Sequence, residues 1–120
     1  MAKIKHIEIA GIDGARLKSF YGDLFDWEIK RNEIVEFDYY DIVAGNEPTA
    51  GIRHEPKGKP EIVIYVEVID LHQSVEKAKA LGAAVRIPPK TYGELQFALI
   101  EDPEGNPIGL TQEKPEGDDA

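Results

Sequence analysis

Two segments with the pattern of half-buried strands carry the polar side chains best suited to chemistry. His6 and Glu8 alternate with Ile7 and Ile9, and Glu67 stands in a later segment of the same kind. Alternate side chains of a strand point to the same face, so His6 and Glu8 share a face that excludes the isoleucines. An imidazole titrates near neutral pH and suits a general base, and a carboxylate can abstract a proton or bind a cation. His6, Glu8 and Glu67 are therefore candidate catalytic or ligand-binding residues.

Each candidate also has a purely structural interpretation. His6 could be a strand histidine that is hydrogen-bonded to a neighbour. The two glutamates could be solvated, or could pair with Arg53, because a buried carboxylate without a partner is costly. Arg53 is thus both a possible partner and a candidate ligand contact. The other histidines, His54 and His72, are expected to be exposed and are given no role.

The composition excludes several classes of function. The 120 residues carry a formal net charge of −9, which argues against nucleic acid, because its binders need a basic face. The absence of cysteine excludes disulfides, thiolate metal sites and a cysteine nucleophile. No apolar run approaches the roughly 20 residues needed to cross a bilayer, and the first residues lack the apolar stretch of a signal peptide. We therefore expect a cytoplasmic protein without a membrane partner.

The chain repeats itself with an offset of 57 residues. The matching positions are Ile7 and Ile64, Ile9 and Val66, Ile12 and Ile69, Asp13 and Asp70, and Leu24 and Leu81. Each copy begins with an alternating strand, followed by an aspartate in the N-cap position and an apolar stripe at helical spacing. The two stripes are Leu17, Phe20, Tyr21, Leu24 and Phe25, and Leu71, Val75, Ala78 and Leu81. Gly82 is a suitable stop for the second helix.

Shorter strand-like runs follow each helix. They span residues 27–30, 34–43 and 50–54 in the first copy, and 84–87, 95–100 and 107–112 in the second. Turns are expected at residues 46–48 and 102–106, a linker at 56–60 and a loop at Pro88-Pro89, since proline is excluded from central strands. The predicted class is α+β, with two βαβββ modules. They occupy about residues 3–56 and 60–113 of a single domain (residues 1–115), and a disordered tail follows (residues 116–120).

Four motifs resemble the vicinal oxygen chelate superfamily, which includes glyoxalase I, bleomycin-resistance proteins and extradiol dioxygenases. They are Ile-x-His-x-Glu-Ile at residues 4–9, Phe-Tyr-Gly-Asp-Leu-Phe-Asp-Trp at 20–27, Tyr-Val-Glu-Val at 65–68 and Asp-Pro-Glu-Gly-Asn-Pro-Ile-Gly-Leu at 102–110. The resemblance implies that the sheets of two modules curl around a central cleft and that the helices lie outside. It also implies a homodimer, because many members of the superfamily dimerise.

The implied cleft defines a set of ligand contacts. His6 and Glu8 would enter it from the first module, and Tyr65 and Glu67 from the second. Tyr40 and Arg53 could also line the cleft, with ordinary strand packing as the alternative for Tyr40. Tyr92 falls in the predicted loop after the two prolines, where a lid over the cleft could lie. The predicted ligand-binding set is His6, Glu8, Tyr40, Arg53, Tyr65, Glu67 and Tyr92.

Metal-dependent members of the superfamily bind one divalent ion through cleft-facing side chains of both modules. Of the positions that supply those ligands, the first falls on His6, the matching one on Val63 and the last on Gly109. The remaining position lies near Ile52 or Arg53. Only His6 is a usual ligand, so the resemblance implies no metal or other cofactor of the ordinary kind. A divalent ion held unusually by His6 with Glu8 and Glu67 is the alternative.

Two functions follow from the resemblance. The first is a protein similar to bleomycin-resistance proteins, which binds a small cationic or aromatic molecule in the cleft without the usual metal. The second is a glyoxalase-like lyase or isomerase in which His6 or a glutamate is the base, with or without a metal. A filled cleft in a protein whose role is dimerisation is a third interpretation.

Overall fold

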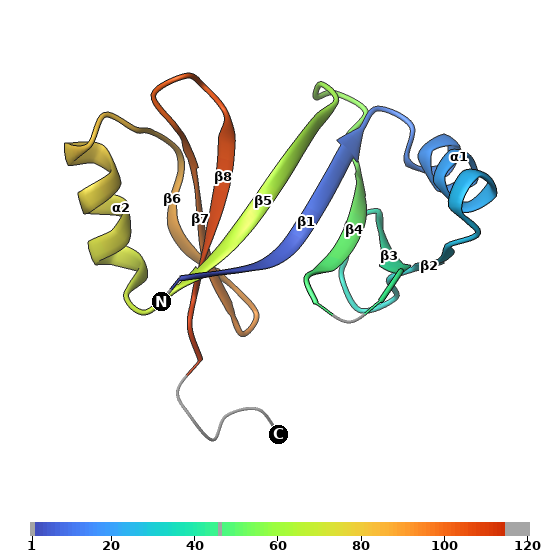
Figure 1. Ribbon diagram of the computed structural model, residues 1–120, viewed down its shortest axis with the longest axis horizontal. Coiled ribbons are helices and arrows are strands. Elements are labelled where there is room, and N and C mark those ends of the chain that lie inside the picture. Colours follow the sequence, from blue (N-terminus) through green and yellow to red (C-terminus); the bar gives the residue numbers. More distant parts are fainter. Residues whose placement is uncertain (1, 46, 115–120) are drawn as a thin grey trace. The chain divides into compact units, whose positions relative to one another are not determined.

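The computed structural model describes residues 2–45 and 47–114 and contains eight strands and two helices (Figure 1). Module one contains β1 (Lys3–Gly11), α1 (Gly14–Phe25), β2 (Glu28–Arg31), β3 (Tyr39–Val43) and β4 (Thr49–His54). Module two contains β5 (Glu61–Val68), α2 (Leu71–Ala80), β6 (Ala84–Tyr92), β7 (Leu95–Glu101) and β8 (Pro107–Gln112). The predicted α+β class and the order βαβββ, present twice, are confirmed.

The described residues divide into two compact units, one of residues 5–45 and 47–63 and one of residues 2–4 and 64–114. Module one and module two are the two βαβββ repeats given above, so residues 61–63 are counted with module two although they pack in the first unit. The strand order in module one is β2-β3-β4-β1, and in module two it is β5-β8-β7-β6. In each, the first and last strands pair in parallel, whereas the other pairs are antiparallel. Each sheet is therefore mixed, as expected.

Both helices begin at the predicted aspartates. The carboxylate of Asp13 accepts a hydrogen bond from the Arg16 amide at 3.1 Å, and that of Asp70 accepts from the Gln73 amide at 3.0 Å. These bonds satisfy amides of the first helical turn that have no partner within the helix. Gly82 follows the last residues of α2 with φ of 103°, a conformation suited to glycine. The predicted start and stop signals are confirmed.

Each helix packs on one face of its own sheet. In module one, Ile29, Ile42 and Ile52 form the buried cluster, and Ile9 and Leu17 pack against it. In module two, the buried cluster comprises Leu71, Val75, Ala98, Ile100 and Leu110. The alternation of β1 thus buries Ile9 on the helix side and turns Glu8 to the opposite face, which fixes the position of the polar residues described below.

Two predicted strand boundaries are wrong. The run from Ile34 becomes a strand only at Tyr39, because the side-chain oxygen of Asn32 accepts hydrogen bonds from the Ile34 and Val35 amides and holds a turn. The predicted loop at Pro88-Pro89 is part of β6. β6 is an edge strand of module two, and its register with β7 shifts around these prolines. Proline lacks a backbone N–H, and at an edge strand this removes no hydrogen bond from the centre of the sheet.

The predicted turn at residues 102–106 is confirmed. One carboxylate oxygen of Asp102 accepts from the Glu104 and Asn106 amides at 2.9 Å each, and these bonds, with the Asn106 side chain, lower the pKa of Asp102. Asn46 of the other predicted turn and the predicted tail (residues 116–120) lie outside the described residues. Neither α1 nor α2 is long and apolar enough to span a membrane.

Candidate functional site

The candidate site is the face of the module one sheet that lies opposite α1. The parallel register aligns His6 with Thr49, Glu8 with Gly51 and Ala10 with Arg53, and the β3 register aligns Tyr39 with Arg53. Residues aligned across neighbouring strands point to the same side of a sheet. We call this surface the polar face. Its functional members are His6, Glu8, Tyr39, Thr49, Gly51 and Arg53.

His6 is hydrogen-bonded through both ring nitrogens. Its Nδ1 lies 2.7 Å from the Thr49 hydroxyl and its Nε2 lies 2.6 Å from the Tyr39 hydroxyl. The single hydroxyl proton of Thr49 is donated to the carbonyl of Lys5 at 3.1 Å, so Thr49 accepts from Nδ1–H. Nε2 of a neutral ring then carries the lone pair and accepts from Tyr39. The chain Tyr39 to His6 to Thr49 therefore has a defined direction of donation.

The surroundings of His6 favour the neutral ring. Burial lowers the pKa of His6 below its ordinary value of 6.5, and the nearby carboxylate of Asp41 opposes the shift only in part. Desolvation disfavours the charged form of a histidine, which accounts for the direction. At neutral pH, His6 can thus accept a proton at Nε2, as the base in a proton transfer must.

A glycine makes the contact between Tyr39 and His6 possible. A Cβ atom at Gly51 would overlap the ring and the hydroxyl of Tyr39, so the ring crosses β4 directly above the Gly51 backbone. Tyr39 is buried, and the ring of Phe37 meets it edge-on with centroids 5.9 Å apart. Gly51 is therefore a requirement of the hydrogen-bonded chain rather than an incidental small residue.

Arg53 lies among three carboxylates. Its guanidinium nitrogens are 3.3 Å from Glu8, 3.6 Å from Glu61 and 3.7 Å from Glu55. Glu8 is only 6% exposed, and its pairing with Arg53 is the salt-bridged alternative noted from the sequence. The Nε of Arg53 is buried and has no hydrogen-bond partner within residues 2–45 and 47–114. Three carboxylates thus gather around one guanidinium beside the polar face.

The other predicted site residues lie elsewhere. Tyr40 is on the helix side of module one, where it packs against the buried isoleucines and the Lys18 ammonium lies 5.9 Å from its ring centre. Tyr65, Glu67 and Tyr92 belong to module two. Glu67 is aligned with Thr111, and Tyr92 ends β6 and is 41% exposed. Of the predicted set, the polar face brings together His6, Glu8 and Arg53.

The positions that supply metal ligands in the superfamily do not fit an ion here. Val63 is fully buried and has no donor atom. The ring of Tyr65 occupies the space that a Cβ atom of Gly109 would need. Within the part of the chain that the structure describes, no group of three or more histidine, aspartate or glutamate side chains could hold a metal ion. At two of the superfamily's ligand positions, this chain thus has an aliphatic side chain (Val63) or a glycine covered by an aromatic ring (Gly109 with Tyr65) in place of a metal-ligating side chain.

Sequence reasoning missed Tyr39, Thr49, Gly51 and Glu61. The alternation of β3 distinguishes Tyr39 from Tyr40 only once the strand is known to begin at Tyr39 and its register with β4 is fixed. The expectation that His54 is exposed is also wrong. His54 is half-buried, and its Nδ1 accepts the amide of Gly14, the first residue of α1, at 2.9 Å. It stabilises the start of α1 from the helix side of the sheet.

The fold agrees with what the chain resembles. A family model described as glyoxalase-like domain matches residues 7–111, nearly the whole chain. The chain belongs to this glyoxalase-like family. It is thereby a member of the vicinal oxygen chelate superfamily, as the four motifs indicated. No curated protein matches this glyoxalase-like chain significantly in sequence.

Three solved structures share the fold of this glyoxalase-like chain. A hypothetical protein (BH1468) from Bacillus halodurans has a TM-score of 0.69 at 14% identity, with 98% of this chain and 99% of that chain covered. Methylmalonyl-CoA epimerase from Streptomyces coelicolor has a TM-score of 0.65 at 14% identity, covering 94% and 98%. The epimerase from Mycobacterium tuberculosis has a TM-score of 0.66 at 16% identity, covering 93% and 88%. At such identities the likeness establishes the fold alone.

Proposed function

We propose that this glyoxalase-like protein binds a small molecule on the polar face of module one, and that it does so without the usual divalent metal. The ligand carries a cationic or aromatic group. The observation that carries the proposal is the cluster at Arg53, where one guanidinium lies within 4 Å of the carboxylates of Glu8, Glu55 and Glu61.

The charge of this cluster supports a cationic ligand. Glu8 and Glu61 have side chains that are 8% and 12% exposed, so both anions are largely removed from water. Electrostatic interactions are weakly screened in such a setting. A ligand cation placed beside these carboxylates would therefore be attracted more strongly than at an exposed surface.

The space beside two glycines supports binding without metal. Tyr39 fills the space beside Gly51 and, in module two, Tyr65 fills the space beside Gly109, so neither position has room for a longer side chain with a donor atom. His6 is the single family ligand position that retains a ligating side chain.

Isothermal titration calorimetry with N-methylquinolinium tests the proposal, and the neutral N-methylquinolinone of similar size is the control ligand. We expect the cation to bind and the neutral compound to bind more weakly. Glu61→Gln should weaken binding of the cation about tenfold, because the variant removes one anion from a largely buried site in which opposite charges attract strongly. The matched variant Glu101→Gln removes a carboxylate that pairs with Arg86 in module two at 2.9 Å, and it should leave the affinity unchanged.

Failure has two distinct forms. Equal affinity for the two ligands, or no effect of Glu61→Gln, would contradict the acidic cluster as the binding site. A stoichiometric divalent metal in the purified protein that is lost in His6→Ala would contradict binding without metal. The second result is read by elemental analysis and does not depend on the choice of ligand.

A second candidate function rests on the chain from Tyr39 to His6. It is an isomerase or lyase of the glyoxalase-like kind that removes a proton from the carbon beside a carbonyl group. In that step the C–H bond breaks, its electron pair enters an enolate, and the proton passes to the Tyr39 oxygen while the Tyr39 proton moves to Nε2 of His6. Thr49 holds the ring in the tautomer that this transfer requires. Return of the proton to carbon, with the His6 proton passing back to Tyr39, restores both residues.

Exchange of the α-protons of 2-oxo acids and thioesters in D2O, followed by NMR, tests this second function. Wild-type protein should accelerate exchange for one of these classes, and Tyr39→Phe should lower the rate about 100-fold or more. Tyr40→Phe is the matched control, because Tyr40 lies on the opposite face of the same strand. Exchange that is absent in wild type, or that falls equally in the two variants, would exclude the function.

A further inference from the structure

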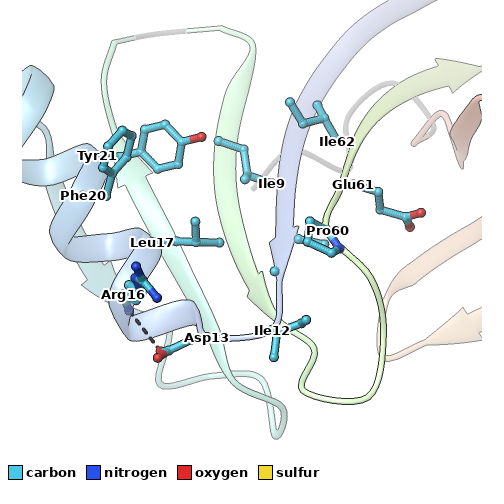
Figure 2. A pocket seen from close by; sticks show the side chains of 12 residues that line it. Ile9, Ile12, Asp13, Arg16, Leu17, Phe20, Tyr21, Pro60, Glu61 and Ile62 are labelled. Atoms are coloured by element: carbon cyan, nitrogen blue, oxygen red, sulfur yellow. Dashed lines mark hydrogen bonds between the residues drawn. The ribbon is translucent and has the colours of Figure 1, made fainter.

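A groove lies beside α1, between this helix, the end of β1 and the start of β5 (Figure 2). Its lining residues all belong to the compact unit of residues 5–45 and 47–63. Ile9 lines the groove, whereas Glu8 belongs to the polar face, so the two sites lie on opposite sides of β1. The volume of the groove is about 780 Å³, which is within the range of sites that bind small organic molecules.

The walls of the groove are mainly apolar and are held by their neighbours. Ile9 and Leu17 form the floor and pack against the buried cluster of module one. Phe20, on the helix side, meets the ring of Tyr21 edge-on with centroids 5.0 Å apart, and Tyr21 is stacked on Trp27. Because these rings are fixed by contacts within the module, a ligand would bind along them without the cost of ordering them.

Three charged residues line the groove, and two of them already have partners. The Asp13 carboxylate accepts the Arg16 amide at 3.1 Å as the N-cap of α1, where the positive end of the helix stabilises its charge. Glu61 is directed away from α1 (Figure 2) and lies 3.6 Å from the Arg53 guanidinium. The Arg16 guanidinium forms no ion pair or hydrogen bond within residues 2–45 and 47–114. Its donors therefore remain available to a ligand.

The polar groups of the groove suit a carboxylate. An arginine side chain donates hydrogen bonds and accepts none, and its planar fork matches the two oxygens of a carboxylate. The Tyr21 hydroxyl is directed away from α1 (Figure 2) and forms no hydrogen bond within the described residues, so it is a second donor on the helix wall. An apolar lining with Arg16 at the start of α1 is thus complementary to a molecule with a hydrocarbon part and one negative group.

We propose that this groove binds a small apolar monocarboxylate, with its carboxylate on Arg16 and its hydrocarbon part along Leu17 and Ile62. Ile62 is 59% exposed, and the ligand would cover it. The offset of 57 residues aligns Arg16 with Gln73 and Leu17 with Ser74, so the second repeat copies neither the cation nor the apolar floor. The site is independent of the polar face, which takes a ligand of the opposite charge.

NMR titration of isotope-labelled protein with octanoate tests the proposal, and octylammonium is the control ligand with a chain of the same length and the opposite charge. Salt at about 0.15 M screens the net charge of −9 that would otherwise repel any anion. We expect octanoate to shift the resonances of Leu17 and Ile62, and octylammonium to leave them in place. Equal shifts with the two ligands, or octanoate shifts confined to the polar face, would overturn the proposal.

Substitution of Arg16 tests the carboxylate contact. Arg16→Gln introduces the residue that stands at the corresponding position of module two, and it should raise the dissociation constant of octanoate about fivefold, since water partly screens an exposed ion pair. Lys18→Gln is the matched control. It removes another cation of α1, whose ammonium lies 5.9 Å from the ring centre of Tyr40, and it should leave the affinity unchanged. Equal effects of the two variants would reduce the contact to the general charge of the helix and overturn it.

A matched pair of isoleucines tests the apolar part. Ile12 lines the groove, Ile69 is its counterpart in module two, and they are 51% and 71% exposed. Ile12→Glu should raise the dissociation constant of octanoate tenfold or more, whereas Ile69→Glu should leave it unchanged, with thermal unfolding confirming that both variants are folded. Equal effects would contradict the groove as the site. If sedimentation equilibrium showed a dimer and octanoate shifted no resonance of the groove, a second copy would cover the groove and the proposal would fail.

Discussion

The two modules keep the same strand pairing and fill the same space with different side chains. Glu8 is aligned with Gly51 in module one, and Tyr65, which is 57 residues after Glu8, is aligned with Gly109 in module two. Both glycines are covered by a tyrosine ring, but the ring comes from β3 in module one and from the first strand itself in module two. Both modules thus have a glycine in the last strand with a tyrosine ring above it, but the tyrosine belongs to a different strand in each module.

This difference decides which module carries the polar chemistry. Because Tyr39 reaches across from β3, the first strand of module one remains free to present Glu8 to Arg53 and His6 to Tyr39. In module two the ring of Tyr65 takes the place that Glu8 has in module one, and Val63 takes the place of His6. The acid–base groups therefore gather in one module of a scaffold that is otherwise double.

Adding a methyl group to each glycine gives the largest expected effect. Gly51→Ala and Gly109→Ala should each lower the free energy of unfolding by about 2–3 kcal/mol, because the new Cβ overlaps a tyrosine ring and forces it out of place. Urea unfolding measures both values. If Gly51→Ala lowered the free energy of unfolding and Gly109→Ala did not, Tyr65 could leave its position without cost. The two glycines would then not play the same structural role.

The Arg–Glu pairs of the two modules should differ in strength. Glu8→Gln leaves a buried guanidinium with fewer anions and should cost about 2 kcal/mol of unfolding free energy. Glu101→Gln breaks the pair with Arg86 in module two, whose side chains are 29% and 35% exposed, and solvent screening should keep its cost at or below about 0.5 kcal/mol. Equal costs in urea unfolding would mean that burial does not distinguish the two pairs.

The neighbouring tyrosines of β3 provide a comparison within module one. Tyr39→Phe leaves Nε2 of His6 without its donor and should cost about 1–1.5 kcal/mol. Tyr40→Phe removes a hydroxyl on the helix side that forms no hydrogen bond within the described residues, so its cost should stay below about 0.5 kcal/mol. A reversed order in thermal or urea unfolding would contradict the assignment of Tyr39 to the polar face.

Sequence patterns predicted the parts of the fold that depend on neighbouring residues. The aspartate caps, the alternation of β1 and the turn after Asp102 are local features, and each is confirmed. The strand boundary at Tyr39 was not predicted, because the turn held by the Asn32 side chain competes with the strand-like composition of the residues that follow it.

The site was predictable only in part, for a related reason. Alternation alone placed His6 and Glu8 together, since both lie on one strand. The choice of Tyr39 over Tyr40, and the contact of Glu61 with Arg53, depend on the register between strands and on the path of the chain into β5. These are long-range properties, and no spacing along one sequence reveals them. Gly51 was the available signal, because a glycine in a strand interior marks a close approach of another group.

The smallest expected effect is a dependence of stability on pH near pH 6.5 that comes from His6 of module one, because Val63 at the corresponding position of module two cannot titrate. The folded pKa of His6 is lowered below 6.5 by burial, so the unfolded chain takes up a proton at a higher pH than the folded chain does. The stabilising contribution of neutral His6 is therefore fully present above pH 6.5 and is lost as the pH falls towards the lower folded pKa.

Urea unfolding between pH 6.5 and this lower pKa should show a steeper loss of stability in wild-type protein than in His6→Gln. His72→Gln, which replaces an exposed histidine of module two, controls for the loss of a histidine as such. Parallel curves for wild type and His6→Gln would mean that protonation of His6 is not linked to folding, and burial would then not hold the ring neutral.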